Sequence, residues 1–360
     1  MKVAIVFATD GTKREDAILA PFRSASFVDG LKIADIDPVM VSVVPDHVAL
    51  GPAGEGELRC RRAGLGEVIA GTRPDAIQTV GPERGLPAIW RIAADIKAPL
   101  VHCVSSRREG IGERDGDAAG SLVPSLAMLR AKRGSRHVDA LIGTSRAAVG
   151  GLMTGGDFPR AAFSVVVPPP VERAAAAAEA ASARASEPVF GIYDPCASAD
   201  LIAFVSHAAQ LTGRPNALQV RIALHEPPPA VAPPLSFVAT DGIDNFLASV
   251  DVLAVPAYDD SVAAALIAAL RSGKSVIVPD RGGAAELIEY GRHGLMFSAG
   301  SAYHLANAMN IVSQSWSQKP VLLADGGPAI ARTHPAAVAH SFAAVYARLL
   351  AVTRRDRGAR

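Results

Sequence analysis

Short apolar runs alternate along the first half of the chain with segments that have helical spacing of apolar residues. The runs cover residues 3–7, 39–44, 76–80, 100–104, 140–142 and 164–167. Runs of this length, rich in β-branched residues and flanked by Gly or Pro, are typical of parallel strands buried on both faces. Residues 86–95 and 124–132 carry apolar positions three and four apart, which predicts crossover helices. The pattern therefore predicts a doubly wound α/β domain over residues 1–170.

A second series of apolar runs follows an Ala-rich segment. Residues 171–187 have high helix propensity and few large apolar side chains, which predicts a partly helical linker. A second α/β domain is predicted over residues 188–334, with residues 227–234 as an exposed, proline-rich connection. Its strands are expected at residues 189–192, 218–224, 235–238, 252–255, 275–278 and 294–297.

The end of the chain has the pattern of one long amphipathic helix. The helix is predicted over residues 335–352, and the arginine-rich residues 353–360 are expected to form a disordered tail. Two doubly wound domains joined by one linker are expected to face a cleft, where ligands bind beyond the carboxyl ends of the strands.

Composition excludes several classes of protein. The chain has 360 residues, 49% hydrophobic and 20% charged, which is typical of globular proteins and not of disordered or fibrous ones. Lys and Arg (36) nearly balance Asp and Glu (35), so no overall charge attracts nucleic acid, and an anionic ligand needs a local site. We therefore expect no nucleic-acid partner.

The cysteines and the N-terminal segment indicate where in the cell the protein is expected. Cys60, Cys103 and Cys196 are far apart and odd in number, which favours reduced thiols in a cytoplasmic protein. The first apolar run is too short for a signal peptide, and no run of about 18 apolar residues occurs. No Gly-x-Gly-x-x-Gly follows residues 3–7, which disfavours a dinucleotide site.

Five short motifs lie in a fixed order between residues 251 and 297. They are a strand ending at Pro256, the acidic pair Asp259 and Asp260, Gly273-Lys274, Gly282-Gly283-x-x-Glu286 and Gly291-x-x-Gly294. Their order and spacing resemble the donor-binding domain of family 4 glycosyltransferases (glycosyl transferases group 1), which have the GT-B fold. The similarity extends from about residue 73 to residue 350, through Arg73-Pro74-Asp75, Val138 to Ser145 and the last helix.

This resemblance implies both a fold and an activity. The fold is α/β of the GT-B type: two doubly wound, Rossmann-like domains facing a cleft, with the C-terminal helix crossing back to the first domain. The activity is the retaining transfer of a sugar from a nucleotide-sugar to an acceptor hydroxyl in bacterial polysaccharide or glycolipid assembly, with no metal and no further cofactor. The donor-binding positions implied are Gly191, Asp260, Ser261, Gly282, Gly283 and Glu286.

Several positions depart from the family's pattern. The Glu that usually binds the donor ribose falls on Ala268, and the glycine-rich loop falls on Ser261-Val262-Ala263. The Arg and Lys that usually hold the diphosphate fall on Ile192 and Ala197. Each such charge-assisted hydrogen bond is typically worth about 1.5–3 kcal/mol, so losing both slows a transfer by orders of magnitude.

The catalytic residues are therefore left unassigned. The family's active-site His falls on Ser105, and Ser105, Asp260 and His102 are the candidates. Two interpretations stay open: a glycosyltransferase with an altered donor, or a catalytically inactive pseudo-glycosyltransferase that acts as partner or scaffold of an active one. An epimerase of related fold is disfavoured because it needs phosphate-binding groups that are missing here as well.

Each candidate also has a purely structural interpretation. Gly282, Gly283 and Glu286 fit a strand-to-helix turn, Asp260 fits a helix cap, and His102 fits a hydrogen-bonded core residue. His293 is expected to be exposed to solvent. Basic residues near position 130 fit either a peripheral membrane contact or a solvated helix end; they are Arg107, Arg108, Arg130, Lys132, Arg133 and Arg136.

Overall fold

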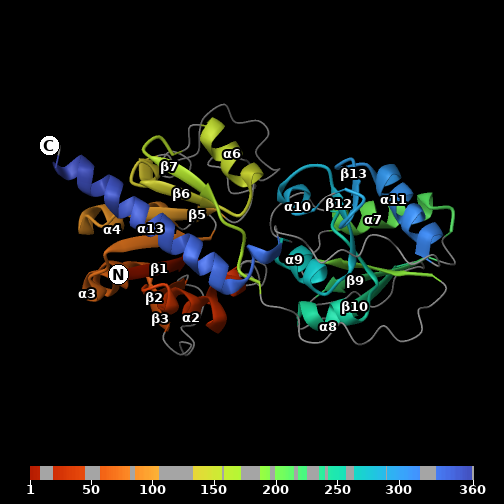
Figure 1. The fold of residues 1–360 in the computed structure, drawn as a ribbon, viewed down its shortest axis with the longest axis horizontal. Helices are drawn as coiled ribbons and strands as arrows, with labels where there is room; N and C mark the ends of the chain where they lie inside the picture. The colour runs from red at the N-terminus through yellow and green to blue at the C-terminus, as the bar shows by residue number, and fades with distance from the viewer. Residues whose placement is uncertain are drawn as a thin grey trace. The chain divides into compact units, whose positions relative to one another are not determined.

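The computed structural model describes residues 1–8, 19–44, 57–81, 86–104, 133–155, 158–171, 187–194, 199–214, 218–224, 235–239, 242–256, 263–288, 290–316 and 330–358. The chain forms two compact units (Figure 1). Unit 1 comprises Met1–Pro170 together with Pro335–Arg360, and unit 2 comprises Val171–His334. Each unit is a parallel β-sheet with helices on both faces, as the apolar runs predict.

Unit 1 contains a seven-stranded parallel sheet in the order β3-β2-β1-β4-β5-β6-β7. Its strands are β1 (Lys2–Ala8), β2 (Asp37–Val44), β3 (Glu57–Arg61), β4 (Ala76–Val80), β5 (Leu100–Val104), β6 (Ala140–Gly143) and β7 (Phe163–Val166). Its helices are α2 (Ala25–Ile33), the 3-10 turn η1 (Arg62–Gly64), α3 (Leu65–Thr72), α4 (Leu86–Ile96), α6 (Arg146–Gly155) and α13 (Pro335–Gly358).

Unit 2 contains a six-stranded parallel sheet in the order β10-β9-β8-β11-β12-β13. Its strands are β8 (Val189–Tyr193), β9 (Gln219–Leu224), β10 (Leu235–Ala239), β11 (Val252–Ala254), β12 (Ser275–Pro279) and β13 (Gly294–Phe297). Its helices are α7 (Ala199–Leu211), α8 (Ile243–Ala248), α9 (Ala263–Arg271), α10 (Gly283–Glu286) and α11 (Ala302–Ser315).

Both faces of each sheet are covered, which explains the unbroken apolar runs in the sequence. Successive residues of a strand point to opposite faces. In β1, Val3, Ile5 and Phe7 pack with α2 and α13, whereas Ala4 and Val6 pack with α3, α4 and α6. In unit 2, α7 and α11 cover one face, and α8, α9 and α10 cover the other. A strand buried on both sides has no polar face to interrupt the run.

Aspartates fix the starts of three strand pairs. Each stands one residue before a strand, and its carboxylate accepts a hydrogen bond from the first backbone N–H of the neighbouring strand. The pairs are Asp75 with Lys2 N (2.8 Å), Asp139 with Leu100 N (2.9 Å) and Asp251 with Val189 N (2.9 Å). These bonds satisfy strand-end amides that the ladder leaves without a partner.

The last helix, α13, belongs to unit 1 (Figure 1). Phe342 makes edge-to-face contacts with Phe22 and Phe27 of the α2 region, at centroid distances of 6.2 and 5.5 Å. The Tyr346 hydroxyl donates to Oε1 of Gln78 in β4. Among the described residues, α13 is the helix that is long and apolar enough to cross a membrane, a property that core helices share.

One strand of unit 1 is missing from the prediction, and one expectation is wrong. Strand β3 was not predicted, because Glu57, Arg59 and Arg61 interrupt any apolar run; as an edge strand it buries only Cys60 among its apolar side chains. Residues 353–358 are helical and not a disordered tail, because arginine is a good helix former and no Pro or Gly occurs before Gly358.

Three predicted segments lie outside the described residues: the helix at 124–132, the linker residues 172–186 and the connection at 227–234.

Candidate functional site

The strand order in the sheet of unit 2 reverses between β8 and β11. From β8 the chain moves outward through β9 and β10, then returns to place β11 on the other side of β8. In open parallel sheets, ligands bind outside the carboxyl ends of the strands at such a reversal. The candidate site of unit 2 therefore lies beyond Tyr193 of β8 and Ala254 of β11.

Gly191 lies in β8, at the centre of this region, and its lack of a side chain has a packing reason. A Cβ atom there would lie 2.8 Å from both γ-carbons of Val250 and 3.0 Å from the ring of Phe246. Helix α8 and the residues after it therefore approach the strand too closely for any other amino acid. Gly191 holds the frame of the site, whatever binds there.

The Gly282-Gly283-x-x-Glu286 motif forms the connection from β12 to the short helix α10. Gly282 has φ 81° and ψ −175°, a backbone conformation that is essentially restricted to glycine. Gly283 is buried, and Glu286 is exposed in the same helix. The motif thus makes the strand-to-helix turn that its structural interpretation requires, at the carboxyl end of β12.

Arg281 is a cation at this edge that sequence analysis left without a role. It follows β12 by two residues, its side chain is exposed, and it makes no hydrogen bond or ion pair within the described part of the chain. The neighbouring Asp280 is engaged, since its Oδ1 accepts from Ala299 N–H at 3.0 Å. Because β12 lies two strands from β8, roughly 10 Å across the sheet, Arg281 flanks the reversal point. A cation between a strand and a glycine pair is the signal that could have found it.

Lys274, the cation of the Gly-Lys motif, lies at the other end of the strands, where they begin. It precedes β12, and its Nζ donates to the carbonyl oxygen of Val250 at 2.9 Å. Burial lowers the pKa of Lys274, while the nearby Asp251 carboxylate opposes that shift. Lys274 therefore ties loops together at the amino ends of the strands and is remote from the candidate site.

The other positions of the resemblance divide into buried residues and residues outside the described ranges. Ile192, where the family has an Arg, is buried in the core beneath α7 and α11. Ala268, where it has a Glu, is buried in α9, and Ala263 begins that helix. Asp260, Ser261, Ala197 and Ser105 lie outside the described residues.

His102 is a core residue of unit 1. It pairs in register with Thr79, whose hydroxyl accepts from Trp90 Nε1 at 3.2 Å and lies 3.1 Å from His102 Nδ1. The other ring nitrogen of His102, Nε2, has no hydrogen-bond partner among the described residues. The ring packs between Trp90 and Phe158. Burial lowers the pKa of His102 to about 3, against a smaller opposing effect of Thr79.

This histidine is expected to make unfolding sensitive to acid. The folded protein keeps His102 neutral, whereas the unfolded chain takes up a proton below pH 6.5, so stability falls as the pH drops from 6.5 towards 3. Between pH 7 and pH 5 the loss is about 2 kcal/mol. Urea unfolding of H102Q should show a flatter dependence on pH than the wild type. H340Q, at an exposed histidine of α13, should keep the wild-type slope; equal slopes for all three proteins would contradict the prediction.

His293 is buried, at 3% exposure, and the expectation that it is exposed to solvent is wrong. The turn before β13 is tight: Gly291, with φ 76°, donates its N–H to the carbonyl oxygen of Gly294 at 2.9 Å. This closed turn folds back on the unit and leaves the histidine side chain inside.

Of the basic cluster near position 130, Arg133 and Arg136 are exposed, and the other members lie outside the described residues.

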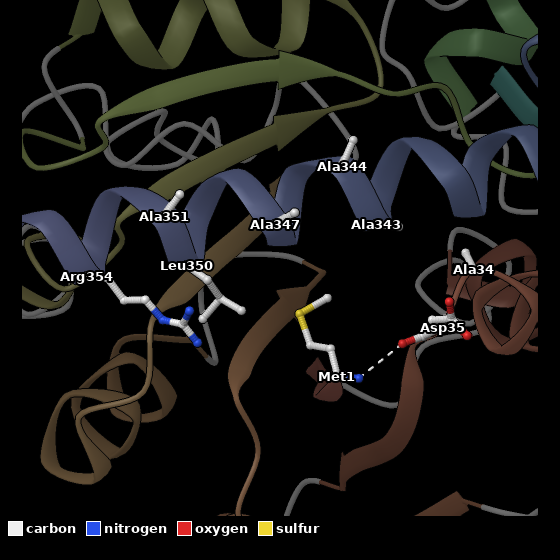
Figure 2. A pocket seen from close by; sticks show the side chains of 9 residues that line it. All are labelled: Met1, Ala34, Asp35, Ala343, Ala344, Ala347, Leu350, Ala351 and Arg354. Atoms are coloured by element: carbon white, nitrogen blue, oxygen red, sulfur yellow. Dashed lines mark hydrogen bonds between the residues drawn. The ribbon is translucent and has the colours of Figure 1, made fainter.

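Unit 1 has an apolar groove beside α13 (Figure 2). It has a volume of about 660 Å³. Ala343, Ala347 and Leu350 line the side of the helix, and Arg354 stands at its end. The opposite side is formed by Met1 and Asp35, where the terminal amino group donates to the Asp35 carbonyl oxygen at 3.1 Å. Ile33, which precedes the lining residue Ala34 in the sequence, is 74% exposed.

A family model described as glycosyl transferases group 1 matches residues 215–315. The matched segment begins just before β9 and ends at the last residue of α11, so it contains β11, β12, Arg281 and the glycine pair. No curated protein matches the sequence.

Solved structures resemble nearly the whole chain. The Anabaena protein Alr3699/HepE, in complex with UDP and glucose, is 14% identical with a TM-score of 0.68, over 95% of this chain and 99% of that one. Sucrose-phosphate synthase from Thermosynechococcus elongatus is 14% identical with a TM-score of 0.72, over 98% and 100%. The lipopolysaccharide outer core galactosyltransferase WaaB is 11% identical with a TM-score of 0.63, over 95% and 98%. The chain has the GT-B fold of these proteins.

Proposed function

We propose that this protein binds a nucleotide-sugar at the carboxyl ends of β8, β11 and β12, and transfers the sugar to an acceptor with retention of configuration. The transfer would serve polysaccharide or glycolipid assembly. The observation that carries the proposal is the match of residues 215–315 to glycosyl transferases group 1, because that segment supplies most of this edge of the sheet. The complexes of HepE with UDP, with UDP and glucose, and with UDP-glucose support the ligand class.

Arg281 has the chemistry to hold the donor's diphosphate. A guanidinium group binds phosphate oxygens through two parallel N–H bonds, and a cation at the leaving group stabilises the charge that develops there. Gly282 leaves the backbone next to it open to close approach, because no Cβ covers it. With a near-neutral chain, recognition of a diphosphate depends on such local groups.

Calorimetry and thermal unfolding with UDP, ADP and GDP test the proposal. A ligand at 100 times its dissociation constant stabilises the folded state by about 2.7 kcal/mol. We expect one of these diphosphates to raise the melting temperature, and the corresponding nucleotide-glucose to be hydrolysed or used for transfer. Absence of stabilisation by all three would contradict nucleotide-sugar binding.

A second candidate function is that of a non-catalytic partner or scaffold for an active glycosyltransferase. The burial of Ile192 and Ala268 favours it, since apolar core residues occupy positions where the family has donor-binding groups. Diphosphate binding without turnover, together with co-purification with a transferase whose rate changes, would support this function. Turnover of any nucleotide-sugar by the purified chain would exclude it.

We also propose that the protein works in the cytoplasm, in peripheral contact with the inner face of the membrane. The apolar groove beside α13, with the exposed Arg354 at its end, supports this location (Figure 2). The exposed Ile33 supports it as well. Apolar side chains flanked by cations are what an anionic interface attracts.

Sedimentation with vesicles tests this contact. We expect several-fold more binding to vesicles containing phosphatidylglycerol than to phosphatidylcholine vesicles at low salt, and a marked loss at 0.5 M salt, because exposed charges are screened. I33E should reduce binding, since it places a carboxylate where an exposed apolar side chain stands. L211E, at an exposed leucine of unit 2, is the control. Equal binding to both kinds of vesicle, or to neither, would contradict the proposal.

A further inference from the structure

A hollow of about 180 Å³ lies between β13 and α11, beside the last strand of the sheet in unit 2. Strand β13 has one neighbour, β12, in the described part of the sheet, so the hollow lies beyond the last strand. It lies along the outer side of β13 and under α11, whereas the proposed donor site lies at the carboxyl ends of β8, β11 and β12.

One face of α11 and the turn before β13 form its walls. His304, Asn307 and Ile311 follow one another at helical spacing and all line the hollow. The opposite face of this helix packs in the core through Leu305, Met309 and Val312, which fixes the helix in place. Across the hollow, Tyr290 is held next to the strand by its bridge to Gly294.

The lining combines an aromatic ring with neutral polar groups. Tyr290 is 66% exposed, and Ser298, His304 and Asn307 contribute a hydroxyl, an imidazole and an amide. Within the described ranges, none of these four side chains has a hydrogen-bond partner, and none of the residues lining the hollow is Asp, Glu, Lys or Arg. The hollow thus presents donors and acceptors without a carboxylate, ammonium or guanidinium group.

We propose that this hollow binds one ring of a neutral saccharide. A pyranose has an apolar face of C–H groups that packs on an aromatic ring, and a rim of hydroxyls that both donate and accept hydrogen bonds. The volume corresponds to about six water molecules at roughly 30 Å³ each, which suits one sugar ring and is small for a larger ligand. The site would hold part of an oligosaccharide chain, whichever reaction the protein carries out.

Other ligand classes fit the lining less well. A phosphate or carboxylate would find no Lys or Arg among the residues that line the hollow. A peptide adding to the edge of β13 would pair along only the four residues Gly294–Phe297 and would leave the side chains of His304 and Asn307 unused.

Saturation-transfer NMR on the full chain tests the proposal. The probes are the methyl glycosides of glucose, galactose, mannose and N-acetylglucosamine, together with maltoheptaose. We expect transfer to at least one probe, and Y290A to weaken its binding at least about 10-fold, equivalent to 1.4 kcal/mol. N307L should weaken it as well, because it removes an amide donor and acceptor while keeping the size of the side chain.

Tyr303 provides the matched control. It is 67% exposed and does not line the hollow, although its ring contacts that of His304 with the centroids 5.7 Å apart. Y303A should bind the probe as the wild type does, and all variants should keep the wild-type melting temperature and affinity for UDP. Absence of transfer to every probe, or equal effects of Y290A and Y303A, would overturn the proposal. Neither outcome bears on the nucleotide-sugar site, which UDP binding reports separately.

Discussion

Replacing Arg281 with alanine is expected to raise the dissociation constant for UDP by about 10- to 100-fold. A charge-assisted hydrogen bond to phosphate is typically worth about 1.5–3 kcal/mol, and each 1.4 kcal/mol changes affinity tenfold. Arg281 is exposed and has no partner in the described ranges, so the loss would come from the ligand and not from a broken protein contact. Calorimetry with UDP and with uridine separates the two parts of the ligand, and only UDP binding should weaken.

Two further variants define what this result means. R281K should recover part of the affinity, because it restores the charge but not the two parallel N–H bonds. R292A removes an exposed arginine that precedes β13 and therefore lies at the amino ends of the strands, away from the proposed donor site. It should leave UDP affinity within about twofold of the wild type. Equal losses for UDP and uridine would exclude Arg281 as a phosphate ligand. If the wild type binds no nucleoside diphosphate, it is the proposed function that fails.

The fold could be predicted from the sequence because both sheets are buried on both faces. Strands β4, β5 and β13 have the predicted bounds, since each is a mainly apolar run followed by a Gly or a Ser. Strand β3 shows the limit of that signal. At the sheet edge a strand can carry charged side chains, so its periodicity disappears.

The site could be predicted less completely, because its residues depend on three-dimensional neighbours. The resemblance located the Gly282-Gly283 turn, which the structure places at the carboxyl end of β12. It could not show that Gly191 is required by Val250 and Phe246, which come close only after folding. Nor could it show that Arg281 lies near the site and Lys274 away from it. Arg281 follows β12 and lies at its carboxyl end, whereas Lys274 precedes β12 and lies at its amino end.

Gly294→Ala is expected to destabilise unit 2 by about 3 kcal/mol. Gly294 opens β13 and pairs with Val276 of β12. A Cβ atom there would lie 2.3 Å from the Val276 carbonyl oxygen and 2.5 Å from its Cγ2, so the backbone of one strand would have to move. Inserting a carbon into a closely packed interior costs about 1–3 kcal/mol, and contact with backbone atoms places this case at the upper end.

Thermal unfolding measures the effect against a control in the same unit. A loss of about 3 kcal/mol lowers the melting temperature by roughly 6–12 °C for a unit of this size. G242A adds a carbon where there is open space but removes the N-cap glycine of α8, so it should lower the melting temperature by less, about 1–4 °C. The resemblance alone treats Gly294 as part of a donor-domain motif, for which substitution would reduce UDP affinity without changing the melting temperature. The structure predicts the reverse order, with stability lost first, because β13 packs against β12 through this residue whether or not a ligand is bound.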